Sequence, residues 1–150
     1  MTRQTLDCRV QIAEGKAQSG AGKPGLLAER LLKLAAGCMG LGSRMHRTVP
    51  GRYVYAQLMR SSASAGANYA EARAGESRAD FVHKLQLVLK ELRETGYWLT
   101  LAVEGGLVTS ATTAPLASEA EELTRMVARS VMTAKSGISA SKPSAGKSRL

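Results

Sequence analysis

One stretch of the chain, residues 60–101, decides the fold: it reads RSSASAGANYAEARAGESRADFVHKLQLVLKELRETGYWLTL. In its later half, apolar or small residues recur in alternating steps of four and three, at Phe81, Leu85, Val88, Leu92, Thr95, Leu99 and Ala102. This spacing places them along one side of an α-helix. The same rhythm precedes it at Val54, Leu58, Ser61, Ala65, Asn68 and Ala72. Because only a short break at Gly75-Glu76 separates the two runs, they predict an antiparallel helical hairpin.

Two further helices are expected outside this hairpin. The first would run from Leu26 through Met45. The residues spaced along its apolar side, which we call its seam, are Leu27, Leu31, Leu34, Cys38, Leu41 and Met45. The last would begin after Val108 and end at Gly137, with its seam at Leu116, Ala120, Leu123, Val127, Ser130 and Ala134. Four such helices joined by short breaks predict an all-α, up-down-up-down four-helix bundle over residues 26–136.

The core of this bundle is expected to contain five residues in particular: Asn68, Tyr69, Phe81, Leu85 and Leu92. Asn68 falls on a seam, so we expect a buried amide that is satisfied by a neighbouring helix. Such a polar seam residue can fix the register of packed helices. We prefer this structural role for Asn68 to a catalytic one.

Composition and charge narrow the class of protein. The chain has 150 residues, 44% of them hydrophobic but only 4% aromatic, and a formal net charge of +9. Such a charge favours an anionic partner. Two cysteines and the lack of an apolar leader or membrane-spanning run suggest a soluble protein of a reducing, cytoplasmic compartment. Residues 1–25 are expected to form a flexible arm and residues 137–150 a disordered basic tail.

The two middle helices carry a family resemblance. Their distinctive residues are Arg60-Ser61, Gly66–Tyr69, Glu71-Ala72, Arg78–Phe81, His83–Leu85, Leu89–Glu91, Glu94-Thr95 and Tyr97–Leu99. In these residues the chain resembles the 23S rRNA intervening-sequence proteins, and the likeness extends over about residues 26–136. The resemblance implies a small all-α protomer that assembles as a ring, commonly a pentamer, and it implies no settled activity. The bundle also resembles the accessory proteins of diversity-generating retroelements, which are basic rings that work with a reverse transcriptase and nucleic acid.

A second apolar face on the third helix predicts oligomerisation independently of the resemblance. Apolar and charged side chains gather opposite the seam: Lys84, Leu87, Glu91, Glu94, Trp98 and Leu101. Apolar residues mixed with paired charges are typical of a subunit interface. We therefore expect a homo-oligomer in which these residues lie between subunits.

Candidate sites for chemistry are few. His46 and His83 stand far apart and lack the spacing of metal ligands, so we expect no metal site. The glycines at positions 20, 22 and 25 match G-x-G-x-x-G, but no strand precedes them, as a dinucleotide site requires. Glu91 and Glu94 are better explained as partners of nearby lysines than as an acid–base pair. We expect no catalytic residue, no cofactor and no enzymatic activity.

Basic residues supply the main functional hypothesis. Residues 31–70 contain five lysines and arginines and no acidic residue. The predicted nucleic-acid-binding residues are Arg30, Lys33, Arg44, Arg47, Arg52 and Arg60. Because aromatic residues are scarce, contact with backbone phosphates is favoured over recognition of unpaired bases. The leading hypothesis is a non-enzymatic nucleic-acid-binding or ribonucleoprotein accessory protein that acts as a basic ring. The alternative is a structural adaptor that holds a protein partner such as a reverse transcriptase.

Overall fold

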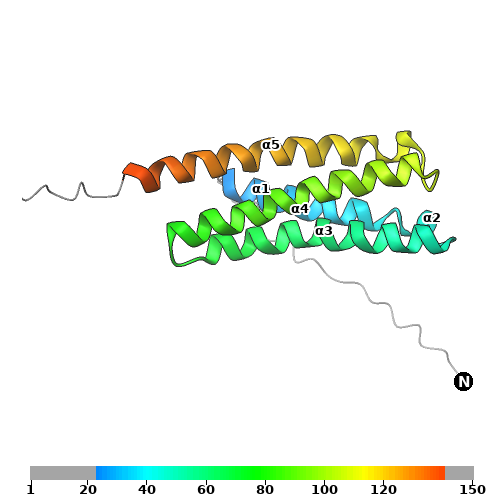
Figure 1. Cartoon of the computed structure of the whole chain (residues 1–150), viewed down its shortest axis with the longest axis horizontal. Coiled ribbons are helices and arrows are strands. Elements are labelled where there is room, and N and C mark those ends of the chain that lie inside the picture. The colour runs from blue at the N-terminus through cyan, green and yellow to red at the C-terminus, as the bar shows by residue number, and fades with distance from the viewer. Residues whose placement is uncertain (1–22, 141–150) are drawn as a thin grey trace, which may run out of the picture.

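The fold consists of four long helices and one short helical turn (Figure 1). The structure, a computed structural model, describes residues 23–140, and side chains over residues 25–136. Helices α1 (Lys23–Met39), α3 (Val49–Ala74), α4 (Arg78–Glu104) and α5 (Ser110–Ala140) run alternately up and down, and α2 (Gly42–Met45) is a single turn before α3. No strand occurs in this part of the chain. The predicted all-α four-helix bundle is confirmed. Expectations for residues 1–22 and 141–150 fall outside the described range.

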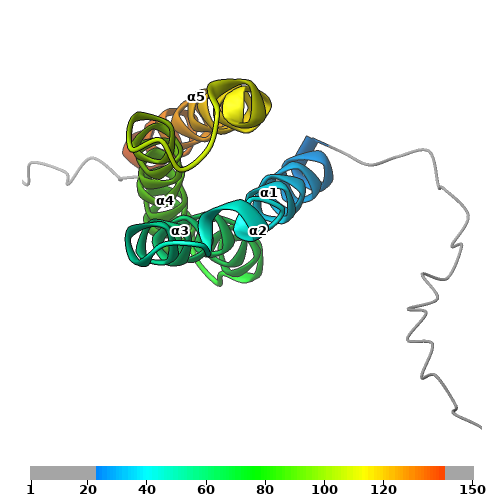
Figure 2. The same cartoon turned by 90° about the vertical axis from the view of Figure 1, so that its right-hand side faces the viewer.

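The helices follow one another around the bundle in chain order. Viewed along the bundle, α3 lies between α1 and α4, and α4 lies between α3 and α5 (Figure 2). Helix α1 is the shortest of the four long helices, so it lies along only part of the length of α3 (Figure 1). The α3–α4 hairpin is therefore the central unit of the fold.

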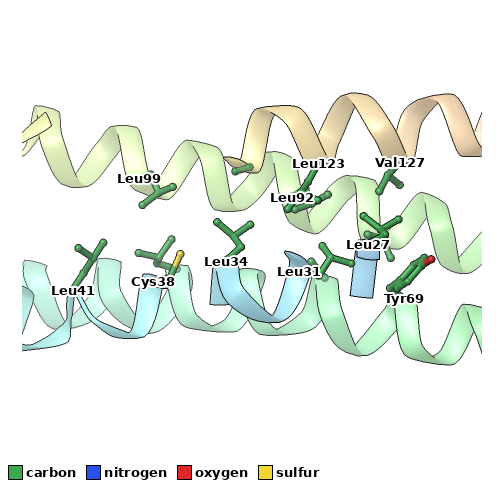
Figure 3. Close-up of a cluster of buried hydrophobic side chains, with 14 of the residues drawn as sticks. Leu27, Leu31, Leu34, Cys38, Leu41, Tyr69, Leu92, Leu99, Leu123 and Val127 are labelled. Carbon is green, nitrogen blue, oxygen red and sulfur yellow. The ribbon is translucent and has the colours of Figure 1, made fainter. Parts of the chain in front are cut away.

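The predicted seams form the core. Leu31, Leu34, Leu58, Leu92 and Leu123 are each at most 1% exposed. Figure 3 shows side chains from α1, α4 and α5 converging on the interior. Fully burying a leucine contributes about 1.5–3 kcal/mol relative to leaving it exposed, so these seam residues dominate the stability of the bundle. Tyr69, Leu85 and Leu92 are buried as predicted, and Phe81 is half-buried against the core.

The seam of the first helix is confirmed, but its predicted continuity is wrong. Helix α1 ends at Met39, and the backbone tightens where the Leu41 N–H donates to the carbonyl of Cys38 at 3.1 Å. Glycine has low helix propensity, and Gly40 lies at this break. Leu41 and Met45 beyond the break remain buried, at 3% and 0% exposed. The burial pattern thus continues across two separate helices.

Two other expectations need correction. Helix α5 does not end at Gly137 but continues to Ala140, because a glycine lowers helix propensity without by itself forcing the backbone out of the helix. Asn68 is half-buried, and its Nδ2 donates to the carbonyl of Ser64 on its own helix at 2.9 Å. Its amide therefore bonds within α3 and not to a neighbouring helix.

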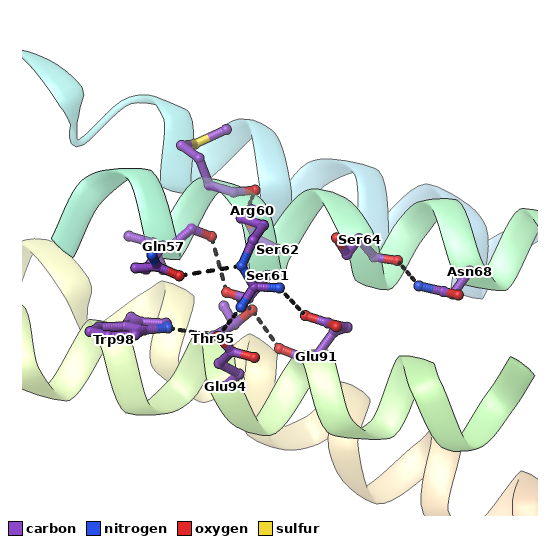
Figure 4. Close-up of polar contacts among 12 residues, drawn as sticks. Gln57, Arg60, Ser61, Ser62, Ser64, Asn68, Glu91, Glu94, Thr95 and Trp98 are labelled. Carbon is purple, nitrogen blue, oxygen red and sulfur yellow. Dashed lines mark hydrogen bonds and ion pairs between the residues drawn. The ribbon is translucent and has the colours of Figure 1, made fainter. Parts of the chain in front are cut away.

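A polar contact does occur in the seam between α3 and α4, at Ser61 and Thr95. Both side chains are 0% exposed, and their hydroxyl oxygens lie 3.1 Å apart. Thr95 Oγ1 also donates to the carbonyl of Glu91 at 2.9 Å, and Ser61 Oγ lies 3.2 Å from the carbonyl of Leu58 (Figure 4). These local bonds allow two hydroxyls to be buried without loss of hydrogen bonding.

Candidate nucleic-acid interface

The structure divides the six predicted nucleic-acid-binding residues into two groups. Three are held by carboxylates of the same chain. Arg30 on α1 donates to Glu119 on α5 through two bonds, Nε to Oε1 at 2.7 Å and Nη2 to Oε2 at 2.8 Å. Lys33 pairs with Glu29 at 2.6 Å, one turn away on the same helix. The charges of these residues are already partly neutralised, so they are poor candidates for phosphate contact.

Arg60 is the third paired residue. It lies on α3 and reaches Glu91 and Glu94 on α4 (Figure 4). Two hydrogen bonds hold the pKa of Glu94 below its usual value. The bond from Arg60 has the larger effect, and the bond from the indole N–H of Trp98 has the smaller. Arg60 therefore joins the two hairpin helices.

The other three predicted residues, Arg44, Arg47 and Arg52, remain available. All three are exposed, and none has a carboxylate within ion-pair distance in the described part of the chain. Arg44 lies on α2, Arg47 on the following loop and Arg52 in the first turn of α3. Arg52 Nη1 donates to the carbonyl of His46 at 3.2 Å, which ties this side chain to the loop. We call these three residues the arginine cluster.

Close packing between α2 and α3 positions the cluster. Thr48 caps α3 by accepting from the N–H of Gly51 at 3.1 Å, and Pro50 occupies the first turn. A Cβ on Gly51 would lie 2.0 Å from the carbonyl oxygen of Met45. Such a distance is far inside van der Waals contact, so only glycine allows the two helices to approach this closely.

Tyr55 fixes the same region from the side. Its hydroxyl donates to the carbonyl of Met39 at 3.2 Å, and its ring meets His46 edge-on with centroids 4.6 Å apart. These contacts hold the end of α1 and the loop against α3. The arginine cluster therefore lies on a turn whose position is fixed by packing against α3.

An aromatic group lies on the outer side of the same hairpin. Tyr53 on α3 meets Trp98 on α4 with ring centroids 6.0 Å apart, and Tyr97 meets Trp98 at 5.1 Å. Tyr53 is 61% exposed and Tyr97 is 60% exposed, whereas Trp98 is half-buried between them and the core. We call these three residues the aromatic patch. The low aromatic content of the chain gave no hint of it.

The predicted interface residues are largely engaged within the chain. Lys84 donates to Glu71 on α3 at 2.5 Å, and Glu91 and Glu94 bind Arg60. The Trp98 indole donates to Glu94 at 3.1 Å, and Leu101 is half-buried against the core. Leu87 is also half-buried. The charged members of this group thus have partners without a second subunit, and whether the group lies between subunits stays a prediction.

Groups that could hold a metal ion, and clefts, are the features of the described residues that bear on chemistry. Within residues 25–136, no three histidine, cysteine, aspartate or glutamate side chains gather closely enough to hold a metal ion. A cleft of about 690 Å³ opens beside the N-terminal turns of α1, between α1, α3, α4 and α5. The charged residues in its lining are Arg78 and Arg129, and the rest of the lining is mainly apolar, with Leu27, Phe81 and Met126 among it. Such a lining can bind a ligand but provides no acid–base pair.

Comparison with known proteins identifies the family. The pattern of the 23S rRNA-intervening sequence proteins matches residues 46–129, which is more than half of the chain. The chain belongs to this family. The matched stretch of the intervening-sequence family includes Arg47, Arg52 and the aromatic patch, and it leaves Arg30, Lys33 and Arg44 outside.

A solved structure supports the assignment. It is the crystal structure of a protein of unknown function from the S23 ribosomal protein family of Bacteroides thetaiotaomicron. The two chains share 28% identity with a TM-score of 0.64, over 70% of this chain and 97% of that one. No curated protein gives a significant match. None of the described helices is both long and apolar enough to cross a membrane.

Proposed function

We propose that this protein is a non-enzymatic nucleic-acid-binding accessory protein whose arginine cluster contacts backbone phosphates. The observation that carries the proposal is the position of Arg44, Arg47 and Arg52, which are exposed at one end of the bundle without carboxylate partners in the described chain. Arginine binds phosphate well because its planar guanidinium can donate two parallel hydrogen bonds. The family name refers to an rRNA insertion, so RNA is the ligand to test first.

The surrounding sequence supports a positive potential at this end. No acidic residue occurs between positions 31 and 70, and the net charge of the whole chain is +9. Other exposed cations, Arg73, Arg78, Arg129 and Lys135, lie near the opposite end, where Glu76 and Asp80 are interspersed with them, whereas Glu104 at the C-terminus of α4 is the exposed carboxylate nearest in the fold to the start of α3. We therefore place the phosphate contacts at the arginine cluster.

Assembly and location form the second part of the proposal. We infer a cytoplasmic homo-oligomer, with the ring of five subunits that the family resemblance implies. A closed ring would repeat the arginine cluster around its axis, so the fields of the subunits would add. Leu87 supports an intersubunit contact because it is apolar, only half-buried and absent from the hydrophobic core. A scaffold ring that binds a protein partner is the second candidate function, and the same apolar side chain favours it.

The test compares two triple variants of the full chain. In the first variant, Gln replaces Arg44, Arg47 and Arg52. In the second variant, Gln replaces Arg73, Arg129 and Lys135. Both variants lose three positive charges and retain both termini, so tail-mediated binding is the same in each. Gel-shift titration against RNA should show weak binding by the first variant and nearly normal binding by the second. Equal loss in both would mean that only net charge matters, and the cluster would not be the site.

A further inference from the structure

Two side chains of the aromatic patch, Tyr53 and Tyr97, are exposed, whereas Trp98 is half-buried against the core. The chain contains one Phe, one Trp and four Tyr, so half of its aromatic residues gather at Tyr53, Tyr97 and Trp98. Both tyrosines expose about three-fifths of their surface. Exposed apolar clusters on soluble proteins usually mark a binding surface.

Cations flank the patch on both of its helices. Arg52 precedes Tyr53 on α3, and Arg93 lies one turn before Tyr97 on α4. Both are exposed and have no carboxylate at ion-pair distance among the described residues. The nearby carboxylate of Glu94 is occupied by Arg60 and by the indole N–H of Trp98. Within the described chain, Arg93 therefore offers an unpaired cation on the same helix face as Tyr97, and Arg52, whose Nη1 donates to the carbonyl of His46, lies one position before Tyr53.

We propose that the aromatic patch binds unpaired bases of single-stranded RNA, which stack on Tyr53 and Tyr97 while Arg52 and Arg93 contact the adjacent phosphates. This inference rests on the proposed function and specifies its ligand as single-stranded nucleic acid. Proteins that bind single strands combine these two elements, because every base has a flat face and every nucleotide has a phosphate. A base pair inside a duplex has no free face to offer, so the patch selects single strands.

The flanking charges argue against a two-fold contact of this patch with itself in a second copy, and the concentration series described below separates a head-to-tail contact, as in the proposed ring, from RNA binding. In a two-fold symmetric contact the same patch meets itself, so Arg52 and Arg93 of one copy would approach those of the other. Such like charges oppose association when no carboxylate is free to separate them. A polyanion meets no such obstacle. The patch also lies at the same end of the hairpin as the arginine cluster, so one RNA strand can contact both.

Trp98 supplies a direct probe because it is the only tryptophan in the chain. A base stacked on the neighbouring tyrosines should change its fluorescence. The full chain is titrated with a short uridine oligomer and with a short RNA duplex. Quenching of Trp98 by the single strand but not by the duplex is the expected result.

Two double variants test the stacking itself. Tyr53→Phe with Tyr97→Phe keeps both ring faces, whereas Tyr53→Leu with Tyr97→Leu keeps apolar bulk without them. Leucine is a strong helix former and both sites are exposed, so both variants should fold. Loss of stacking typically weakens binding roughly five- to a hundred-fold per base. The Leu variant should lose single-strand affinity by that order and keep duplex affinity, while the Phe variant keeps both.

Each other outcome is decisive. If the Leu variant binds the uridine oligomer as tightly as the wild type, the stacking proposal is overturned, while salt-sensitive duplex binding would leave the proposed function standing. If neither RNA binds, both proposals fail. If Trp98 fluorescence instead changes with protein concentration in the absence of RNA, and the Leu variant abolishes that change, the patch is a contact between copies and the RNA assignment is overturned.

Discussion

Arg30 and Glu119 join the first and last helices of the bundle through two parallel hydrogen bonds of 2.7 and 2.8 Å. Oε1 of Glu122 lies 3.7 Å from Nη1 of Arg30. The same nitrogen donates to Sδ of Met126 at 3.1 Å. The Arg30 side chain is 22% exposed and that of Glu119 is 32% exposed, so water screens the pair only in part. Arg30 thus links α1 to α5.

This pair predicts a stability change with pH. The hydrogen bond from Arg30 lowers the pKa of Glu119 in the folded state. The stabilisation is therefore fully present above the pKa of an unfolded glutamate, about 4.3, and is lost as the pH falls through the lower folded value. Glu119→Gln should reduce the free energy of unfolding by about 1 kcal/mol at neutral pH. Urea unfolding at neutral and acid pH measures this, and the difference between variant and wild type should shrink at acid pH. A constant difference would contradict the linkage.

Gly51 and Gly66 form a matched pair for the packing of α3. A Cβ at Gly51 would meet the Met45 carbonyl at 2.0 Å, whereas one at Gly66 has no neighbouring atom within 4 Å. Gly51→Ala should therefore lower the melting temperature and disturb the turn that carries the arginine cluster. Gly66→Ala should raise stability by about 0.5–1 kcal/mol, because alanine favours the helix. Thermal unfolding monitored by circular dichroism measures the direction of the change in melting temperature for each variant. A change in the same direction for both variants would contradict the structure.

Asn68 should tolerate replacement. Its amide bonds to the Ser64 carbonyl of the same helix and its side chain is only half-buried, so Asn68→Leu leaves no partner on another helix unsatisfied. We expect a change of less than about 1 kcal/mol in the free energy of unfolding. Thr95→Val, which leaves the buried Ser61 hydroxyl without that neighbour, should cost more. Denaturant titration of both variants compares them, and a larger loss for Asn68→Leu would show that its amide has another role.

Assembly is tested at Leu87. This side chain is half-buried on α4 and does not pack against the core, so Leu87→Asp should keep the helical fold. If Leu87 lies between subunits, the charge should shift the mass from that of a ring to that of smaller species. Leu32→Asp is the control, since Leu32 is 69% exposed and was not assigned to an interface. Sedimentation measures the mass, and a monomeric wild type or an intact Leu87→Asp ring would oppose the assignment.

The sequence predicts the buried face of each helix well, because burial follows the local spacing of three and four residues. Leu34 and Leu123 are examples whose burial needed no knowledge of neighbouring helices. Ion pairing could not be predicted in the same way. Arg30 and Glu119 are 89 positions apart, and their contact depends on how α1 and α5 come together. Two of the six predicted cationic residues, Arg30 and Arg60, were lost to such long-range pairs, whereas Lys33 pairs with Glu29 on its own helix.

The aromatic patch had a signal in the sequence that composition concealed. An antiparallel hairpin brings together residues equally distant from its turn, and Glu76 lies in the turn between α3 and α4. Tyr53 is 23 positions before Glu76 and Trp98 is 22 positions after it. The register of the hairpin therefore places them side by side, whereas the low count of aromatic residues favoured phosphate contact over recognition of unpaired bases.

The salt dependence of RNA binding tests most directly whether the arginine cluster contacts phosphates. Each phosphate contact contributes about −0.7 to the slope of log K against log salt for a single strand and about −0.9 for duplex DNA. Replacing Arg44, Arg47 and Arg52 by Gln in the full chain should therefore flatten the slope by about two to three, with circular dichroism unchanged. The variant with Arg73, Arg129 and Lys135 replaced should keep the wild-type slope. Identical slopes for the wild type and the cluster variant, or no RNA binding by the wild type at low salt, would contradict the assignment.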